Sequence, residues 1–528
     1  MRSLDSYIKN SVLYDSNSSR KKIIDKTLAE MVALDVQPYS IVEDRGFIKY
    51  SKIMDARYKL PSRRHLQSVL MMDLFKKTSA KLSTILEEVS SVAVTCDIWS
   101  SRANISFLTV TSHFIHEFTL KTASLATRKL LDATNHSAQN IANTLQEVLN
   151  SWGLFDKTEC IVTDNASSMI KACELLKIRN IPCFAHTLNL VVQDGLNFDD
   201  DEKTMAIISK CKAIVKFFKK STIANEKFKM AQEKFGYSLL QETPTRWNSF
   251  FYMIQRILAT HDEIAVVLLS TSNAPLPFQA EEIDVLKDME KILTVFEEVS
   301  KRISGGKYAT ISLIIPLTDV LIRKTHTISS DVHTEVGQKM VTVLLDSIVK
   351  RLSPYEKKTA TRMATILDPR FKKIGFQHMS NAEQAAHCFE NELTALMNKD
   401  SSNDTNVEPI STNKDPLFDY IGNKARSMAR NTRSDAIIAK RQYLERPLSQ
   451  QDVDPLLWMK VNQTDFPAIK TLMLKYFCIP ATSVQSERVF SKAGQIVSDR
   501  RTRLKEENVN ILLFLNQNLS LTSSETTE

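Results

Sequence analysis

Two aspartates follow runs of residues that are typical of buried β-strands. Asp97 comes after the β-branched and apolar run 91–96, and Asp164 comes after the run 160–163. We expect each aspartate to close its strand. If the two strands are parallel neighbours, both carboxylates project from the same edge of one sheet. Carboxylates held close together repel each other and favour a divalent cation between them. The alternative is that Asp97 and Asp164 only cap strands or form turns.

A third carboxylate would complete a site for two Mg²⁺ or Mn²⁺ ions about 4 Å apart, which clamp the attacking and leaving oxygens at a phosphate. The elements around the two aspartates are suited to place such a site. β-Rich runs, separated by turn-like segments, alternate with helical spacing in the predicted order β-β-β-α-β-α-β, and the first three strands are expected to be antiparallel neighbours. The runs cover residues 91–99, 105–115, 119–131, 141–152, 160–164, 166–176 and 181–184.

The rest of the chain has a helical pattern. Only 10 of its 528 residues are glycine, which favours long helices over an all-β architecture. The predicted divisions are a disordered N-terminus, a helical domain, an α/β core, an all-helical insertion with a linker-like loop at 400–416, an apolar C-terminal region and a disordered tail. Their limits are 1–20, 21–90, 91–190, 191–452, 453–519 and 520–528.

Composition excludes several classes of protein. The seven cysteines are widely spaced and form no CxxC pair, which indicates reduced thiols rather than a disulfide framework. The polar N-terminus is not a signal peptide, and no apolar run is long enough to span a membrane. Lys and Arg exceed Asp and Glu by eight (69 − 61), which permits a polyanionic partner without requiring one. Cys183 and His186 have CxxH spacing but lack a second ligand pair, so we predict no structural zinc.

Six short motifs occur in a fixed order along the chain. They are DARYKLPSR at 55–63, TCDIWS at 95–100, TDNA at 163–166, CFAHTLNL at 183–190, TRWN at 245–248 and SERVFSKAG at 486–494. Together they resemble the hAT transposase superfamily and, within it, the transposase-derived zinc-finger BED-domain-containing proteins. The resemblance spans roughly residues 20–519. It implies a ribonuclease-H-like core interrupted by a long helical insertion, with a C-terminal dimerisation segment.

The resemblance also implies a catalytic acidic triad of Asp97, Asp164 and Glu487. These side chains would bind Mg²⁺ or Mn²⁺ and activate first water and then a DNA 3′-hydroxyl. Glu487 follows Asp164 by 323 residues (487 − 164), so the insertion must return the chain to the sheet. Taken without its flanking motif, Glu487 is equally consistent with a carboxylate favoured near a helix N-terminus after Pro480.

Two further residues correspond to DNA contacts in the family. His186 would contact a phosphate beside the active site, and Trp247 would stack on a base turned out of the duplex. Arg246, beside Trp247, and Arg488, beside Glu487, are predicted to bind DNA as well. The alternatives are a hydrogen-bonded histidine beside a buried cysteine, and a core tryptophan at the start of a helix.

The C-terminal region 453–519 resembles the family's dimerisation segment, so we expect a homodimer or a higher oligomer. The predicted dimer contacts are Trp458, Leu504, Val509, Leu512 and Leu513, whose apolar stripe is wide enough to bury against a partner. The alternative is that this stripe packs only within its own chain.

The resemblance implies a nuclear, DNA-associated protein. Family members usually carry a BED zinc finger, which this sequence does not contain, so a BED-finger-bearing relative is a candidate partner. The intact acidic residues favour a transposase that cleaves DNA and transfers strands. The missing finger favours a domesticated, non-cutting dimerisation module that binds chromatin and regulates transcription. A simple nuclease is the weaker third option, because it would not need the dimerisation segment.

Overall fold

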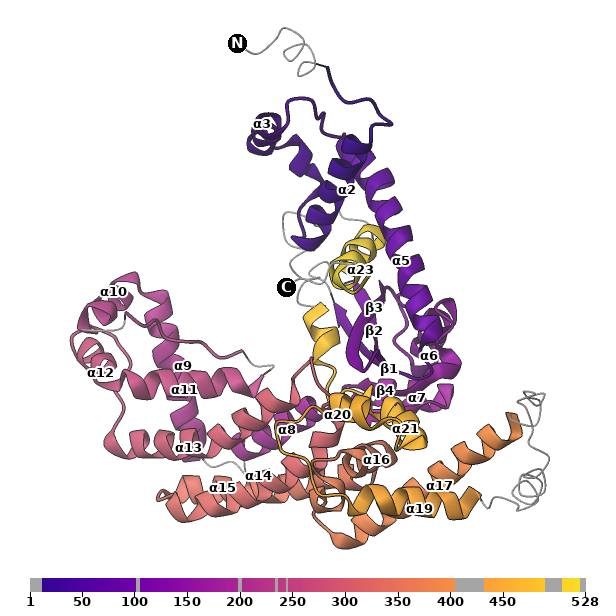
Figure 1. Ribbon diagram of the computed structural model, residues 1–528. Coiled ribbons are helices and arrows are strands. Elements are labelled where there is room, and N and C mark those ends of the chain that lie inside the picture. Colours follow the sequence, from indigo (N-terminus) through magenta and orange to yellow (C-terminus); the bar gives the residue numbers. More distant parts are fainter. Residues whose placement is uncertain are drawn as a thin grey trace, which may run out of the picture. The chain divides into compact units, whose positions relative to one another are not determined.

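The structure is a computed structural model that describes residues 12–100, 105–197, 202–232, 236–243, 246–403, 432–489 and 506–522. The chain folds into two compact units (Figure 1). Unit 1 combines Met1–Ile181 with Cys478–Glu528, and unit 2 is Pro182–Phe477. The fold is mixed α/β and mostly helical, with one small sheet in the described residues.

The sheet of unit 1 has five strands in the order β3-β2-β1-β4-β5. β1, β2 and β3 form an antiparallel meander, and β4 pairs with β1 in parallel. The strands are β1 (Val92–Ser100), β2 (Ser106–His116), β3 (Thr119–Arg128), β4 (Thr158–Thr163) and β5 (Arg179–Pro182), with helices α6 (Ala138–Ser151) and α7 (Ser167–Leu176) between the last three. The predicted order β-β-β-α-β-α-β and the antiparallel pairing of the first three strands are confirmed.

The middle of the sheet contains a buried polar cluster. The side chain of His113 is 2% exposed, and its Nε2 lies 3.1 Å from Oγ1 of Thr95 while its Nδ1 lies 3.0 Å from Oγ1 of Thr122. Thr95 also hydrogen-bonds Thr111 across the β1–β2 pair. These bonds compensate the imidazole for the water it loses on burial. Burial lowers the pKa of His113 to about 3, because it disfavours the charged imidazolium.

Helices cover the free edge of β3. The last described helix, α23 (Glu506–Thr522), packs on β3 and on the N-terminal helices α2 (Ser19–Leu34) and α5 (Met71–Glu88). The side-chain amide of Asn518 accepts from the backbone N–H of Ser124 at 3.0 Å and donates to its carbonyl at 2.8 Å. Oδ1 of Asn510 likewise accepts from the backbone of Thr127 at 2.8 Å. Side chains of a helix thus satisfy backbone groups that an edge strand would otherwise leave unpaired.

The chain ends differ from the predicted disorder. Residues 12–18 are held by Tyr14, whose backbone N–H donates to the carbonyl of Arg57 and whose hydroxyl donates to Asp55, each at 3.0 Å. α2 already begins at Ser19, and α23 continues to Thr522. The prediction of disorder was therefore wrong for residues 12–20 and 520–522. Residues 1–11 and 523–528 lie outside the described residues.

Unit 2 is built from helices. They are α8 (Phe184–Leu196), α9 (Glu202–Lys220), α10 (Thr222–Ala231), α11 (Trp247–Ala259), α12 (His261–Leu269), α13 (Ala280–Ile303), α14 (Ile314–Ile328), α15 (Glu335–Arg351), α16 (Thr359–Leu367), α17 (Met379–Asn403), α19 (Thr432–Glu445), α20 (Pro455–Asn462) and α21 (Pro467–Phe477). α8 packs along α15, where Arg351 binds the carboxylate of Asp194 through two nitrogens at 2.7 and 3.0 Å. Most of the predicted linker-like loop 400–416 lies outside the described residues, and α17 extends into its start.

The C-terminal region does not form one piece with the core, as the sequence had suggested. α20 and α21 belong to unit 2, where α21 packs against α16 and α17, and unit 1 regains the chain only at Cys478. The reason is that α21 buries Ile469, Leu472 and Met473 among helices of unit 2. The limits of unit 2 are thus 182 and 477, against the predicted insertion 191–452. Within the described residues, no helix is long and apolar enough to cross a membrane.

Candidate functional site

The register of the sheet sets Asp97 and Asp164 side by side. On β1 and β4, Thr95 pairs with Val162, and Asp97 and Asp164 each follow two residues later in the same direction. Neighbouring strands lie about 4.8 Å apart, and residues two apart share a face of the sheet. The two aspartates therefore occur at one level of adjacent parallel strands. Only Asp164 follows the end of its strand; Asp97 lies inside β1, which continues to Ser100, so the prediction that Asp97 closes a strand was wrong.

Asp164 also shapes the turn that leads into α7. Its Oδ1 accepts a hydrogen bond from the backbone N–H of Ala166 at 3.2 Å, just before the helix begins at Ser167. This is the turn-forming role that the sequence left open as an alternative. One carboxylate oxygen is thus used locally, and the other is not part of this turn.

Glu487 reaches the same site from the far end of the chain. Residues 484–489 are helical, and the backbone N–H of Glu487 donates to the carbonyl of Ser483 at 3.3 Å. Ser486 and Val489, at 0% and 3% exposure, anchor this segment in unit 1, and Glu487 is partly exposed. Its place near a helix start also fits the alternative of a carboxylate favoured by the helix dipole. The rest of the SERVFSKAG motif lies outside the described residues.

The charges of Asp164 and Glu487 act on Asp97. The pKa of Asp97 is raised to about 7, first by burial and then by the negative charges of Glu487 and Asp164, while a hydrogen bond from the backbone of Ile98 opposes the shift. The fold thus brings within electrostatic reach three acidic residues that are separated by up to 390 positions (487 − 97).

The arrangement fits an oxygen-liganded cation in its charge and its donors. Carboxylates that raise one another's pKa are relieved by a divalent cation, and Mg²⁺ or Mn²⁺ prefers such oxygen ligands. Among the described residues, however, no three His, Cys, Asp or Glu side chains are gathered closely enough to ligate one ion. Among the described residues, the structure therefore shows a concentration of negative charge but not a complete set of metal ligands.

The predicted DNA-contacting residues other than Arg488 belong to unit 2. His186 lies in the first turn of α8 and is partly exposed, behind the buried Cys183. Arg246 is exposed at the N-cap of α11, and Arg488 is exposed in unit 1. The structure thus brings together the acidic residues alone, and binding of DNA by His186, Arg246 and Arg488 stays a prediction.

Trp247 lies at the start of α11. Its side chain is only 5% exposed, and its ring centroid lies 6.1 Å from that of Phe251. Its backbone N–H donates to Oδ1 of Asn189 at 3.0 Å, which fixes the start of α11 to α8. In this conformation the ring is largely covered by the chain, and base stacking by Trp247 stays a prediction. The alternative of a core tryptophan at a helix start describes it.

The predicted dimer contacts are occupied within the chain. Val509, Leu512 and Leu513 are at most 1% exposed, because α23 fills the space between β3, α5 and α2. Trp458 stacks on Phe466 of its own unit, with ring centroids 6.3 Å apart. The alternative of internal packing therefore describes Val509, Leu512 and Leu513, whereas Trp458 is partly exposed and its dimer contact stays a prediction. Leu504 lies outside the described residues.

The sequence missed two exposed apolar side chains on α20. Leu457 and Val461 are 57% and 80% exposed and lie four residues apart, so they share one face of the helix. Their i, i+4 spacing was visible in the sequence, but the predicted dimer contacts included the neighbouring Trp458 instead.

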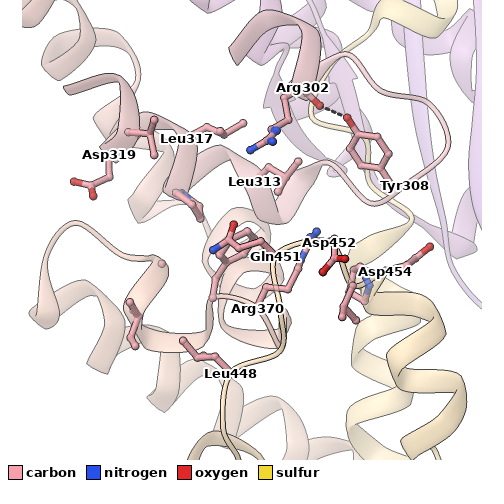
Figure 2. Close-up of a pocket in the computed structure, with 17 residues that line it drawn as sticks. Arg302, Tyr308, Leu313, Leu317, Asp319, Arg370, Leu448, Gln451, Asp452 and Asp454 are labelled. Atoms are coloured by element: carbon pink, nitrogen blue, oxygen red, sulfur yellow. Dashed lines mark hydrogen bonds between the residues drawn. The ribbon is translucent and has the colours of Figure 1, made fainter. Parts of the chain in front are cut away.

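Unit 2 also contains a hollow of about 560 Å³ with mixed walls (Figure 2). Arg302, Arg370 and Asp452 line it together with Leu313 and Leu317. Arg370 is bound through two nitrogens to the buried carboxylate of Asp368, at 2.9 and 2.7 Å, so its charge is already compensated. None of the predicted site residues lines this hollow.

Comparison with known proteins agrees with the ribonuclease-like architecture. Three family profiles match separate parts of the chain: the ZBED1 RNase-like domain at residues 95–182, the ZBED1 RNase-like helical domain at 181–292 and the hAT family C-terminal dimerisation region at 440–519. The fold and these matches define a ribonuclease-like protein with a region for self-association.

The relatives are of the same kind. The chain is 26% identical to human zinc finger BED domain-containing protein 4 over 97% of its own length and 45% of that protein's. It is 24% identical to human zinc finger BED domain-containing protein 6, over 94% and 55% of the two lengths. It is 26% identical to the transposable element Hobo transposase of Drosophila melanogaster, over 56% and 46%. The chain fits the family of BED-domain proteins derived from hAT transposases, and it spans about half the length of these relatives.

Proposed function

We propose that this chain is a hAT transposase-like protein that cleaves DNA phosphodiesters with divalent cations held by Asp97, Asp164 and Glu487. The observation that supports the proposal is the register of β1 and β4, which sets Asp97 and Asp164 at one level of adjacent parallel strands. Burial and the charges of Glu487 and Asp164 raise the pKa of Asp97 there. In this proposal the helical unit 2 is an insertion into a ribonuclease-H-like core. The protein would act on DNA in the nucleus as a homodimer or higher oligomer, with a BED-finger-bearing relative as a candidate partner.

The three carboxylates would have different roles. Asp97 and Asp164 would hold the cation from adjacent strands, and Glu487 would close the site from the C-terminal helix. Bound Mg²⁺ or Mn²⁺ would neutralise charge at the scissile phosphate and lower the pKa of water. Because Asp97 takes up a proton near pH 7, the site loses one ligand charge below that pH.

Nicking of supercoiled plasmid tests the proposal without knowledge of a target sequence. With Mn²⁺, the wild type is expected to nick, and Glu487→Gln is expected to lose the activity by about two orders of magnitude or more, since the variant keeps the shape but not the charge. Asp156→Asn, which changes an exposed aspartate of the same unit, serves as the control and should retain cation-dependent nicking. Equal nicking by wild type and Glu487→Gln would refute the catalytic role of Glu487.

A non-cutting, domesticated module is the second candidate. The absence of a closed ligand set among the described residues and the burial of Trp247 favour it. Such a protein would bind chromatin and regulate transcription as a dimer. A folded, dimeric wild type that is as inert as Glu487→Gln in the nicking assay would support this candidate over the first.

We predict that the exposed face of α20 contributes to self-association. Leu457→Ser combined with Val461→Ser is expected to weaken the dimer at least tenfold, because each buried apolar side chain contributes about 1.5–3 kcal/mol. Sedimentation equilibrium measures the change in dissociation constant. Leu276→Ser with Leu269→Ser alters two other exposed leucines of unit 2 and should leave the dimer unchanged. Equal weakening by both pairs, or by neither, would contradict the assignment of this face.

A further inference from the structure

A stripe of positive charge runs along α3 (Arg45–Met54), a helix of unit 1 in which no side chain is buried. Arg45, Lys49 and Lys52 are all exposed and follow one another at i, i+4 and i+7, so they project from one face. At 1.5 Å per residue, the stripe is about 10 Å long. The same length of duplex DNA carries about six phosphate charges.

The chain returns beside this stripe. Segment 58–62 lines a hollow of about 410 Å³ together with Ile48, Ser51 and Lys52 of α3 and with Val42 and Glu43. Lys59 is thus a lining residue, and Arg63 and Arg64 follow it and are exposed. α3 and the short helix α4 (Arg63–His65) both pack on η1 (Tyr39–Glu43), which connects the two segments. The basic surface consists of Arg45, Lys49, Lys52, Lys59, Arg63 and Arg64.

The charges of the basic surface are not compensated within the described part of unit 1. None of its six side chains forms an ion pair there, whereas other lysines of the unit do: Lys77 lies 2.7 Å from Asp73, for example. Residues 43–65 contain seven Lys and Arg and three acidic residues, a net charge of +4 (7 − 3) against +8 for the whole chain. Like charges held together repel, and a bound polyanion relieves that repulsion.

The seventh cation of this segment has a structural role. The guanidinium of Arg57 lies 4.5 Å from the ring centroid of Tyr14, and its Nε donates to the carbonyl of Val12 at 3.0 Å. Arg57 thus connects residues 12–14 to the loop that carries Lys59. The motif 55–63 thereby supports the basic surface, and Lys59 and Arg63 do not take part in this contact.

We propose that the basic surface binds the phosphodiester backbone of duplex DNA without reading its sequence. The proposal rests on the DNA-directed function proposed above and names a second point of contact, separate from the carboxylates. The stripe of cations along α3 favours a regular polyanion, since duplex DNA presents about six phosphate charges over the same length. Of the six cations, Lys52 and Lys59 also line the hollow. A second copy of this chain would present the same positive charge and be repelled.

The salt dependence of DNA binding tests the proposal. The full chain is titrated against a fluorescent 30-base-pair duplex of arbitrary sequence, by anisotropy, over a range of KCl concentrations. The triple variant Arg45→Gln, Lys49→Gln, Lys52→Gln is expected to reduce the slope of log K against log salt by about 2–3, since each phosphate contact contributes about 0.9. At 0.1 M salt its affinity should fall by about a hundredfold.

A matched control removes the same charge elsewhere. Lys22, Lys76 and Lys177 are exposed in unit 1 and form no ion pair within the described residues, and their triple change to Gln should leave the slope within about one unit of the wild type. Equal losses in both triple variants would overturn the proposal, because net charge alone would then explain the binding. Circular dichroism and thermal unfolding establish that each variant is folded.

Two further measurements separate the other occupants. If the α3 triple variant keeps the wild-type slope of log K against log salt but no longer cosediments with phosphatidylserine vesicles, the proposal is overturned in favour of a membrane surface. If it keeps that slope but no longer forms the dimer, the proposal is overturned in favour of a second copy of the chain. The variant Glu487→Gln should keep the full slope, so failure of nicking and failure of the basic surface are read independently.

Discussion

A divalent cation is expected to raise the melting temperature of the wild-type chain at pH 8 by several degrees, and to raise that of Asp97→Asn far less. The charges of Asp164 and Glu487 and the burial of Asp97 make its ionised form costly, and a cation bound between the carboxylates removes that cost. A ligand at a hundred times its dissociation constant stabilises a protein by about 2.7 kcal/mol.

Without a divalent cation, Asp97→Asn is expected to stabilise the fold. The pKa of Asp97 is about 7 in the folded chain and 3.8 as its ordinary value, so the folded state holds a proton that the unfolded state has lost. The resulting stability is fully present below pH 3.8 and is lost as the pH rises through 7. In EDTA at pH 8, Asp97→Asn should therefore be more stable than the wild type, by at most about 4 kcal/mol.

Thermal unfolding at pH 5 and pH 8, each with Mn²⁺ and with EDTA, measures both effects. Asp156→Asn is the control, since Asp156 is an exposed aspartate of the same unit. Its cation response and its pH profile should match those of the wild type. If Mn²⁺ stabilises Asp97→Asn as much as the wild type, the cation does not bind at Asp97, and the proposed catalytic site is wrong.

Acidification is expected to weaken the fold through His113. Its pKa is about 3 when buried in the sheet and 6.5 as its ordinary value, so the unfolded state takes up a proton that the folded state refuses. The stability it contributes is fully present above pH 6.5 and is lost as the pH falls towards 3. The loss is about 1.4 kcal/mol per pH unit and about 5 kcal/mol at most.

Urea unfolding between pH 7 and pH 4 measures this loss. His113→Gln should lower stability at pH 7, because Thr95 and Thr122 lose their ring partners, and it should flatten the dependence on pH. His136→Gln replaces an exposed histidine of unit 1 and should keep the wild-type slope. Since Asp97 contributes a slope of the opposite sign, the difference between variant and wild type is the informative quantity. A variant with the full wild-type slope would show that His113 is not the group that titrates.

The strands and the first helices of unit 1 could be predicted because their patterns are local. Runs such as SVAVTC alternate along the chain with segments of helical spacing. Their β-branched residues favour a pleated, buried strand. The place of Asp97 within β1 was not predicted, since Ile98, Trp99 and Ser100 continue the pairing with β2 beyond it. The register of the sheet depends on which strands pair with each other, and the local sequence of a strand does not determine its partner.

The helical faces show the opposite situation. An apolar stripe reveals that a face is covered but not what covers it, so Val509, Leu512 and Leu513 suited a dimer as well as a core. The structure fills that face with β3, α5 and α2 of the same chain. For the same reason the sequence alone left open whether Trp247 is a core residue or stacks on a base.

By itself, the sequence determined the order of strands and helices and the likeness to hAT-derived proteins, because each is carried by residue types and local spacing. Only the tertiary structure decided that Glu487 acts on the pKa of Asp97, that Trp247 is buried, and that Asn510 and Asn518 bind the backbone of β3. Those facts depend on segments far apart in the chain meeting in space, and the free energy of that packing is shared among all the residues at each contact.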